Sequence, residues 1–282
     1  MKPNFLIIGA ARSGTTSIYH YLSQHPNVFF SEVKELNFFS NPRYWDKGFV
    51  WYERKFRPKY GDVLCLGEAS TSYTRSPFNA ETARRIYEYN PNFRLIYIVR
   101  DPIKRFISHY LHNVGVGKER RDFERLLDNL EEESIAWQGL YYFQIKQYLE
   151  YFEREQILVV SMDQLKSCPE SVMKDVYGFL GLGPFTEIKD LKKAHNANRN
   201  IAIKSEFGGL VSAFYSYYIE QLAIPYRIKK VFMRLSDVGS KPIGTPKLDQ
   251  KQYRKLRAFY EEDAVKLRGE FGIDIDSWFM VD

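Results

Sequence analysis

The chain has 282 residues, of which 44% are hydrophobic, 27% charged and 16% aromatic. This is the composition of a globular protein, and it excludes the disordered, collagen-like and disulfide-scaffold classes. Lys and Arg number 41 against 35 Asp and Glu, so the formal net charge is +6. Such a mild excess favours an anionic partner but does not distinguish a nucleotide from a nucleic acid or a membrane.

The cysteines and the N-terminal segment bear on the compartment. Cys65 and Cys168 are too few for a disulfide framework, and we expect both to be unpaired thiols in or near the core. The apolar run at residues 5–11 is short for a secretory signal and is interrupted by Arg12. No apolar run reaches the roughly 18 residues that a membrane-spanning helix needs. We therefore expect a soluble, cytoplasmic protein.

Strands and helices alternate along the first two-thirds of the chain. Short apolar runs predict strands at residues 4–9, 62–67, 93–99 and 157–160. Caps, prolines and helical periodicity predict the helices that follow them, from Gly14 to Pro26, after Ser76–Pro77, after Asp101–Pro102, within 122–133, from about Tyr141, and from Pro169 to about Gly181. This alternation predicts an α/β fold in three layers, with a mostly parallel sheet flanked by helices.

Two of these helices carry specific expectations about burial. In the helix after Ser76–Pro77, the residues expected to face the core are Ala80, Ala83, Ile86 and Tyr87. In the helix after Asp101–Pro102, the buried stripe is Ile103, Phe106, Ile107, Tyr110 and Leu111. The residues that fall outside this second stripe are Lys104, Arg105, Ser108 and His112.

A glycine-bearing loop at residues 9–16, Gly-Ala-Ala-Arg-Ser-Gly-Thr-Thr, joins the first strand to the first helix. Its backbone N–H groups and the helix N-terminus suit a phosphate, and Thr15 and Thr16 add hydroxyl donors. The G-x4-G spacing of nucleoside-triphosphate loops is kept, but Thr15 stands where those loops place Lys. No acidic residue closes an apolar strand as a Mg²⁺ ligand would. We therefore expect a nucleotide that is handled without metal.

A second candidate contact with an anion lies at Arg100 and Ser108. Arg100 follows the strand at 93–99, at the edge where parallel sheets bind their ligands. Ser108 lies outside the buried stripe of the next helix, so both side chains suit one anion. The alternative is a surface Arg100 paired with Asp101, next to a solvated Ser108.

Together these segments resemble the sulfotransferases that use 3′-phosphoadenosine-5′-phosphosulfate (PAPS). Residues 12–17 resemble that family's 5′-phosphosulfate loop, and residues 100–108 resemble its 3′-phosphate motif. Lys-Glu-Leu-Asn-Phe-Phe at 34–39, followed by Trp51–Tyr52, is similar to the bacterial and glycan-modifying branch. The segments at 139–141 and 179–182 also match in order. The resemblance covers about residues 4–200 and implies the P-loop, nucleotide-kinase-like sulfotransferase fold.

The resemblance implies transfer of a sulfonate from PAPS to a hydroxyl or amine, with release of PAP and no metal. Glu35 would be the general base and Arg12 would stabilise transition-state charge, while Lys34 is either a second catalytic cation or solvent-facing. The implied PAPS-binding residues are Ala11, Arg12, Ser13, Gly14, Thr15, Thr16, Ser17, Arg100, Ser108, Tyr141 and Arg199. For Tyr141 core packing is the alternative, and for Arg199 it is an ordinary polar linker. His109 and His112 are the fallback bases.

The chain departs from the family pattern at two positions. Arg12 replaces a Lys found in many members, which exchanges a point charge for a planar guanidinium. Ala69 stands where the glycan-modifying enzymes place a Lys, which weakens the case for a heparan-like acceptor. The acceptor therefore stays open among a glycan, the hydroxyl of a lipid-like or other small molecule, and a protein tyrosine. An ATP-dependent P-loop small-molecule kinase and a non-catalytic nucleotide-binding protein are the alternatives, and dispersed charge disfavours a nucleic-acid partner.

From about residue 188 the pattern becomes helical. We expect a single domain over 1–282, with an α/β nucleotide-binding core at 1–187 and a helical, acceptor-side extension at 188–282. The last helix should bury Tyr253, Leu256, Tyr260, Ala264 and Leu267. The aromatic-rich segment 207–235 is interpreted as a buried packing helix, an acceptor-binding lid or a peripheral membrane contact.

Overall fold

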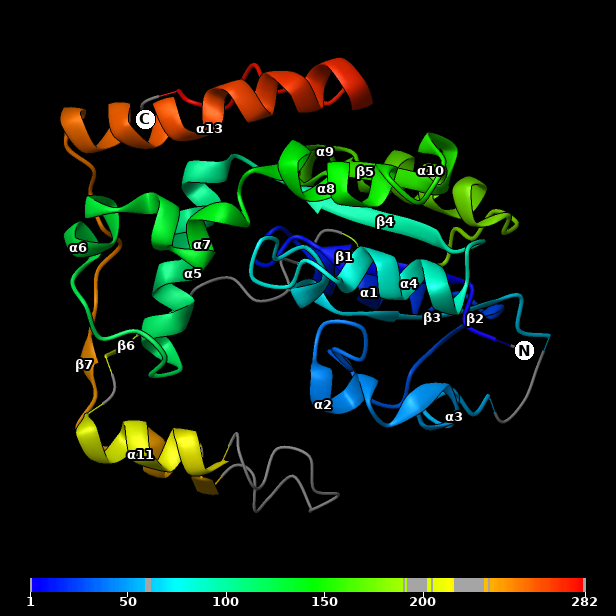
Figure 1. Cartoon of the computed structure of the whole chain (residues 1–282), viewed down its shortest axis with the longest axis horizontal. Helices are drawn as coiled ribbons and strands as arrows, with labels where there is room; N and C mark the ends of the chain where they lie inside the picture. Colours follow the sequence, from blue (N-terminus) through cyan, green and yellow to red (C-terminus); the bar gives the residue numbers. More distant parts are fainter. Residues whose placement is uncertain are drawn as a thin grey trace.

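The computed structural model describes residues 2–58, 62–189, 191, 202–203, 205–215, 231–232 and 234–280. Its centre is a five-stranded parallel sheet in the order β2-β3-β1-β4-β5, with helices on both faces (Figure 1). The strands are β1 (Phe5–Gly9), β2 (Val28–Phe30), β3 (Cys65–Ala69), β4 (Arg94–Val99) and β5 (Ile157–Ser161). The predicted α/β class is confirmed.

The predicted strands are correct at β1, β4 and β5 and need correction elsewhere. The second strand begins at Cys65, three residues later than the predicted range, since residues 62–64 precede its ladder. The edge strand β2 was not predicted because three residues are too few for a periodic pattern. It pairs in parallel with β3 through Val28, next to Cys65.

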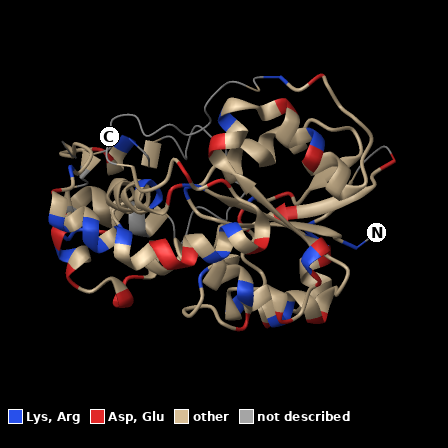
Figure 2. Cartoon of the chain, turned by 90° about the horizontal axis from the view of Figure 1, so that it is seen from above, with Lys and Arg blue, Asp and Glu red and all other residues tan. Residues whose placement is uncertain are grey.

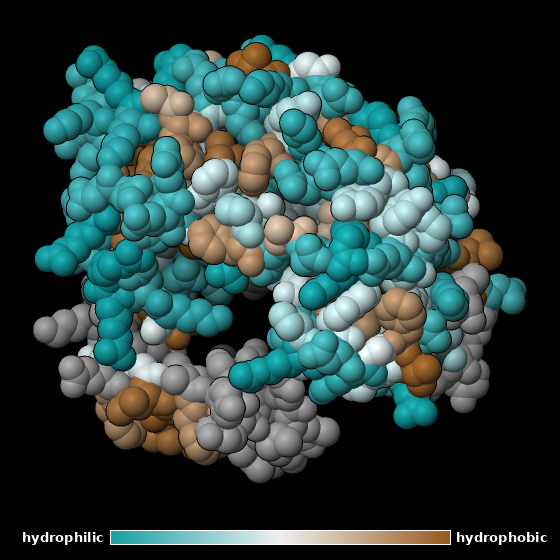
Figure 3. Space-filling view, viewed as in Figure 1, coloured by the Kyte–Doolittle hydropathy of each residue, from teal (hydrophilic) through white to brown (hydrophobic). Residues whose placement is uncertain are grey.

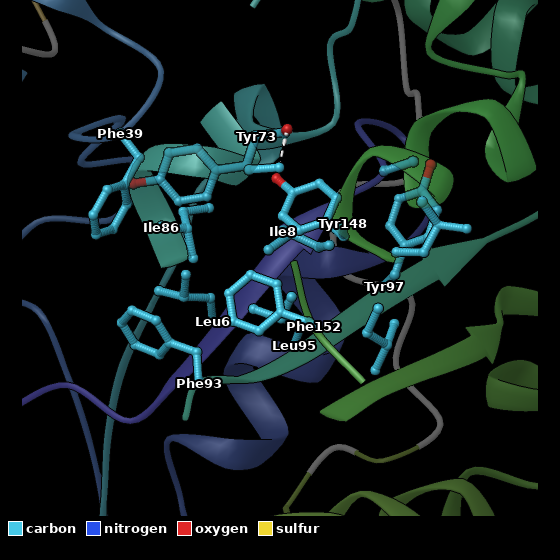
Figure 4. Close-up of a cluster of buried hydrophobic side chains, with 14 of the residues drawn as sticks. Leu6, Ile8, Phe39, Tyr73, Ile86, Phe93, Leu95, Tyr97, Tyr148 and Phe152 are labelled. Carbon is cyan, nitrogen blue, oxygen red and sulfur yellow. Dashed lines mark hydrogen bonds between the residues drawn. The ribbon is translucent and has the colours of Figure 1, made fainter. Parts of the chain in front are cut away.

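One face of the sheet packs against α4 (Thr82–Tyr89), α8 (Tyr141–Leu149) and α13 (Gln250–Phe271). Leu6 and Ile8 of β1 point to this face because alternate residues of a strand point to opposite sides. They meet Ile86 and Tyr148, as Figure 4 shows, and the cluster also contains Leu267 of the last helix. The C-terminal helix is therefore part of the core.

The other face packs against α1 (Thr15–Leu22), α9 (Met162–Ser167) and α10 (Pro169–Leu180). Phe5 and Ile7 of β1 point to this side, where they meet apolar side chains of α1 and α10. Gly181 ends α10 in the left-handed conformation, with φ 71°, as the predicted helix end requires. Helices thus cover both faces, which gives the predicted three layers.

A third cluster lies beyond the end of the sheet. It is formed by α5 (Pro102–Gly115), α6 (Phe123–Asp128), α7 (Ser134–Trp137) and the first half of α13. Asp101 caps α5 by accepting from the backbone N–H groups of Ile103 and Lys104. The prediction that Arg105 and Ser108 lie outside the buried face is wrong, because both are buried. Since α5 is covered on more than one side, a single apolar stripe does not describe its burial.

The helix expected at Ser76–Pro77 begins at Thr82 instead, and Ala80 and Tyr87 are exposed. The side chain of Gln144 on α8 explains the difference. Its Oε1 accepts from the Ser76 N–H at 2.8 Å, and its Nε2 donates to the Ser76 carbonyl at 2.8 Å. These two bonds hold the backbone at Ser76 in a loop and delay the helix.

The last third was predicted to be helical only, but it also contains two short strands. Ala202–Ile203 (β6) pairs antiparallel with Lys241–Pro242 (β7), a two-residue ladder too short to predict. The final helix buries Leu256, Tyr260, Ala264 and Leu267 as expected, whereas Tyr253 is only partly buried. In the aromatic-rich segment, α11 spans Glu206–Phe214, and residues 216–230 lie outside the described residues.

The remaining elements are short. They are α2 (Pro42–Trp45), α3 (Gly48–Glu53) and the 3-10 helices η1 (Thr71–Tyr73), η2 (Leu130–Glu132) and η3 (Arg154–Gln156). Cys65 is buried as expected, but Cys168 is exposed, so the prediction of a near-core thiol is wrong there. None of the helices in the described part of the chain combines the length and the hydropathy needed to cross a membrane.

Candidate active site

A cavity of about 2010 Å³ opens at the carboxyl edge of the sheet, beside the loop after β1 and the segment after β4. Most of the predicted site residues line it. These are Ala11, Arg12, Gly14, Thr15, Thr16, Ser17, Glu35, Arg100 and Ser108. Of the others, Ser13 and Tyr141 are fully buried, and Arg199 lies outside the described residues. The fold therefore brings segments that are far apart in sequence to one cavity.

The phosphate loop has the backbone that an anion-binding loop needs. Gly14 has φ 97°, and Arg12 adopts the left-handed region with φ 68° although it is not a glycine. Such a conformation is unfavourable for a residue with a side chain, and it concentrates at functional sites. Helix α1 begins at Thr15, directly after the loop, so its positive end is next to the cavity.

Two arginines lie side by side at this loop. The Arg12 Nε donates to the Ser108 Oγ at 3.3 Å, and the Arg100 Nη1 donates to the Arg12 carbonyl at 3.0 Å. Burial, and then repulsion by Arg100, lower the pKa of Arg12. Burial also lowers the pKa of Arg100. Two neighbouring guanidinium groups that line one cavity favour a ligand with more than one negative charge.

A hydrogen bond to Tyr141 holds the backbone of Arg100. Its backbone N–H donates to the Tyr141 hydroxyl at 3.4 Å, and the tyrosine ring packs near Tyr97 and Trp278 in the core. Tyr141 is fully buried, so its packing alternative describes the position well. Tyr141 therefore holds the end of β4 rather than lining the cavity.

Glu35 lines the same cavity as the arginine pair and lies on the segment after β2. Its Oε2 accepts from the Thr71 N–H at 2.8 Å and from the Thr71 hydroxyl at 3.2 Å. Burial raises the pKa of Glu35, while the Thr71 bonds and the charge of Lys34 oppose the rise. A carboxylate with a raised pKa accepts a proton more readily near neutral pH, as a general base must.

Lys34 contacts the phosphate loop and does not point to bulk solvent. Its Nζ donates to the Thr16 hydroxyl at 2.8 Å and lies 5.3 Å from the centre of the Tyr19 ring. Burial lowers the pKa of Lys34, and the charge of Glu35 opposes that effect. Lys34 thus connects the segment that carries Glu35 to the loop that would hold the phosphates.

Glu68 supports the Glu35 segment, and sequence reasoning missed it. This fully buried carboxylate of β3 accepts from the hydroxyls of Tyr52 at 3.0 Å, Tyr73 at 2.6 Å and Ser70 at 2.7 Å. The Ser70 Oγ in turn accepts from the Asn37 N–H at 3.0 Å. Burial raises the pKa of Glu68 to about 7, and the three hydroxyl donors oppose it.

The backbone next to this network is strained. Glu35 and Asn37 both have positive φ, 59° and 53°, which non-glycine residues rarely adopt. The Glu35 N–H donates to the Ala69 carbonyl at 3.0 Å, in addition to the Ser70–Asn37 bond. These bonds to β3 compensate the strain and fix the direction of the Glu35 side chain. In the sequence, the only sign of the supporting network was Glu68, a charged residue inside an apolar strand.

Charge outside the cavity has no such organisation. Figure 2 shows Lys and Arg interspersed with Asp and Glu over the helices rather than gathered on one face. Within the described residues, no group of three or more His, Cys, Asp or Glu side chains is arranged to hold a metal ion. The site is therefore defined by cations and backbone amides around one anion-binding loop.

The fold and the site define an α/β protein with a P-loop-type anion site and a carboxylate that lines the same cavity. The sequence profile of the family described as "Sulfotransferase domain" matches residues 2–268. The chain belongs to this sulfotransferase family of enzymes, as its sequence motifs had indicated.

Two curated human relatives are similar to part of the chain. Heparan sulfate glucosamine 3-O-sulfotransferase 5 of Homo sapiens is 33% identical over 193 residues, which are 64% of this chain and 54% of that protein. The bifunctional heparan sulfate N-deacetylase/N-sulfotransferase 2 of Homo sapiens is 29% identical over 202 residues, 65% of this chain and 22% of that protein. The match thus spans about half of the first relative and about a fifth of the second.

A solved bacterial structure is similar over the whole chain. The sulfotransferase from Alicyclobacillus acidocaldarius covers 99% of this chain and 100% of its own, with a TM-score of 0.69 and 24% identity. At this identity the likeness establishes the fold and not the substrate.

Proposed function

We propose that the protein transfers the sulfonate of PAPS to a hydroxyl or amine of an acceptor and releases PAP. The observation that carries the proposal is the placement of Glu35 and the Arg12–Arg100 pair on the walls of one cavity. The family membership and the order of the motifs support the same conclusion.

The donor would bind across the phosphate loop and the 100–108 motif. The loop amides and the hydroxyls of Thr15 and Thr16 suit the 5′-phosphosulfate, because they present donors at a helix N-terminus. Arg100 and Ser108 suit the 3′-phosphate, since a guanidinium and a hydroxyl both donate to phosphate oxygens. We leave Arg199 as a proposed contact, as it lies outside the described residues.

Glu35 would take the proton of the attacking acceptor group. The acceptor oxygen or nitrogen forms a bond to sulfur while the bond from sulfur to the bridging phosphate oxygen breaks, and the proton goes to the Glu35 carboxylate. Arg12 would neutralise the charge that develops on the bridging oxygen and the sulfonate. Lys34 would hold the Glu35 segment to the phosphate loop through the Thr16 hydroxyl. Thr71 keeps the carboxylate in place, since it donates twice to one oxygen.

The acceptor class is a separate proposal. The two human relatives act on heparan sulfate according to their names, which favours a glycan among the three acceptor classes considered. Ala69, in place of the Lys of the glycan-modifying enzymes, argues against a close match to that substrate. We therefore propose a glycan or other hydroxylated small molecule without assigning its identity.

A peripheral membrane contact through 207–235 is also proposed. In α11, Phe207, Leu210 and Phe214 are exposed, and hydrophobic residues gather over α11 in Figure 3. An exposed apolar helix face favours an interface with lipid. Flotation with liposomes tests this: binding that is lost in Phe207→Ser supports the contact, and no binding of the unmodified protein contradicts it.

Calorimetry tests the donor. We expect PAP to bind in buffer that contains EDTA, and ATP with Mg²⁺ to bind at least tenfold more weakly. This order is expected because Thr15 stands where ATP-binding loops have Lys. The reverse order of affinities would favour the kinase alternative.

A further inference from the structure

Arg105 and His109 lie one turn apart on α5. Arg105 is fully buried, its Nη1 lies 3.0 Å from the His109 Nδ1, and its Nη2 donates to the Ile135 carbonyl. A guanidinium has no acceptor atom and keeps its protons, so Nδ1 must be the acceptor in this bond. The neutral ring therefore carries its proton on Nε2, and Arg105 fixes this tautomer.

The surroundings of His109 are cationic. His109 lines the cavity, and the charges that act on it are those of Arg105, His112, Arg12 and Arg75. Burial and these charges hold the pKa of His109 well below its ordinary value, so the ring is neutral at neutral pH. A neutral ring whose Nδ1 is occupied presents an N–H donor and not a base.

His109 lines the same cavity as Arg12 and Glu35. Ser108, its neighbour in sequence, accepts from Arg12 on the phosphate loop. Arg75 belongs to the segment that follows β3, the same segment whose Thr71 holds Glu35. Arg75 also lines the cavity, where its Nε donates to the Ser134 hydroxyl at 2.8 Å. His109, Arg75 and Glu35 thus line one cavity, in which the acceptor would bind.

The burial of the Arg105 guanidinium destabilises the fold unless other groups compensate its charge. No ion pair among the described residues includes Arg105, and its Nε has no hydrogen-bond partner there. A buried charge without a carboxylate partner is destabilising in general, and an apolar side chain would fill the same volume at less cost. A negative group next to His109 would offset the positive charges of Arg105, Arg12 and Arg75 that act on this ring.

We propose that the Arg105–His109 pair is a fixed N–H donor that binds an anionic oxygen of the acceptor, a carboxylate or a sulfate ester, beside the group that Glu35 deprotonates. The proposal rests on the proposed function and assigns a specificity-determining residue to it. His109 selects acceptors that carry this anion, and Arg75 adds a second positive charge to the same subsite.

Nitrogen-15 NMR of the histidine rings tests the proposal, with inorganic sulfate as the probe and PAP present at saturation. We expect the Nε2–H tautomer of His109 in the PAP complex, and a shift of its Nε2 resonance when sulfate is added. A shift that is complete with PAP alone would assign the donor N–H to the nucleotide and overturn the proposal. An Nδ1–H tautomer would overturn it as well.

A pair of variants separates hydrogen bonding from packing. In His109→Gln the amide reproduces an N–H donor near Nε2, and we expect sulfate affinity of the PAP complex within about threefold of the unmodified protein. His109→Leu removes the donor, and we expect about tenfold weaker binding of sulfate with PAP affinity unchanged. Equal sulfate affinity in both variants would contradict the proposal. Failure of PAP to bind at all would instead contradict the proposed function.

Discussion

The two walls of the cavity are built in different ways. The donor wall consists of the loop at 9–16 and the segment at 100–108, each a continuous run of residues at the end of a strand. The wall that carries Glu35 depends on contacts between distant residues, such as Thr71 with Glu35 and Glu68 with Tyr52. The first wall can therefore be found from sequence motifs, whereas the second becomes visible only in three dimensions.

The largest expected effect is on the wall that carries the base. Glu35→Gln keeps the shape of the side chain and removes its ability to take a proton. We expect kcat to fall by about 10²–10⁴-fold with PAP affinity nearly unchanged. Steady-state kinetics and PAP calorimetry on the same preparation measure both. His112→Ala is the matched control, and loss of turnover there with retained turnover in Glu35→Gln would assign the base to the donor side.

Arg100→Ala breaks the donor wall. It removes the guanidinium that donates to the Arg12 carbonyl and would contact the 3′-phosphate. We expect PAP affinity to fall roughly 10- to 100-fold, the usual range for a lost hydrogen bond to a charged group. Calorimetry measures it, with Arg257→Ala on the exposed face of α13 as a control that leaves PAP affinity unchanged. Equal PAP affinity in the two variants would remove Arg100 from the donor site.

Because Glu68 supports the Glu35 segment and has a raised pKa, the stability of the protein should depend on pH. The pKa of Glu68 is raised from 4.5 to about 7 in the folded protein, so the folded state binds more protons between these values. The stability that the protonated Glu68 provides is present in full below about pH 4.5 and is lost as pH rises through about 7. We expect a decline of up to about 1.4 kcal/mol per pH unit from this group.

Urea denaturation at several pH values checks this decline against Glu68→Gln, which cannot titrate. The difference in unfolding free energy between the two proteins should change between pH 5 and 7, roughly the interval between the two pKa values. A difference that is constant over this interval would show that Glu68 does not change its protonation there.

Lys34 is the connection between the two walls, and its removal should have the smallest effect. Lys34→Met keeps the length of the side chain and removes the bond to the Thr16 hydroxyl. We expect kcat/KM to fall about 3- to 10-fold, as for one hydrogen bond of ordinary strength. A loss as large as that of Glu35→Gln would make Lys34 a principal catalytic cation rather than a connecting residue.

The fold was predictable where a local pattern decides it. The apolar runs of β1 and β4 and the cap of α5 by Asp101 follow from residues that are neighbours in sequence. Where a side chain that is distant in sequence determines the local structure, the prediction from sequence is wrong. Gln144 delays the start of α4, and the helices around α5 bury Arg105.

The same distinction applies to the candidate site. The loop residues and Arg100 line the cavity as the motifs indicated, because each motif lies at the end of a strand. Glu68 was missed, and His109 was named only as a fallback base without its Arg105 partner, because these roles come from bonds across the sheet and along α5. A carboxylate in an apolar strand gave no indication of its partners.

One measurement tests the central claim most directly: mass spectrometry of the products formed from labelled PAPS and a library of hydroxylated acceptors in EDTA-containing buffer. We predict a sulfonated product with the unmodified protein, and at most a hundredth of that initial rate with Glu35→Gln, which should bind PAP equally well. Equal product formation by both proteins would contradict the account, because Glu35 would then not be the base.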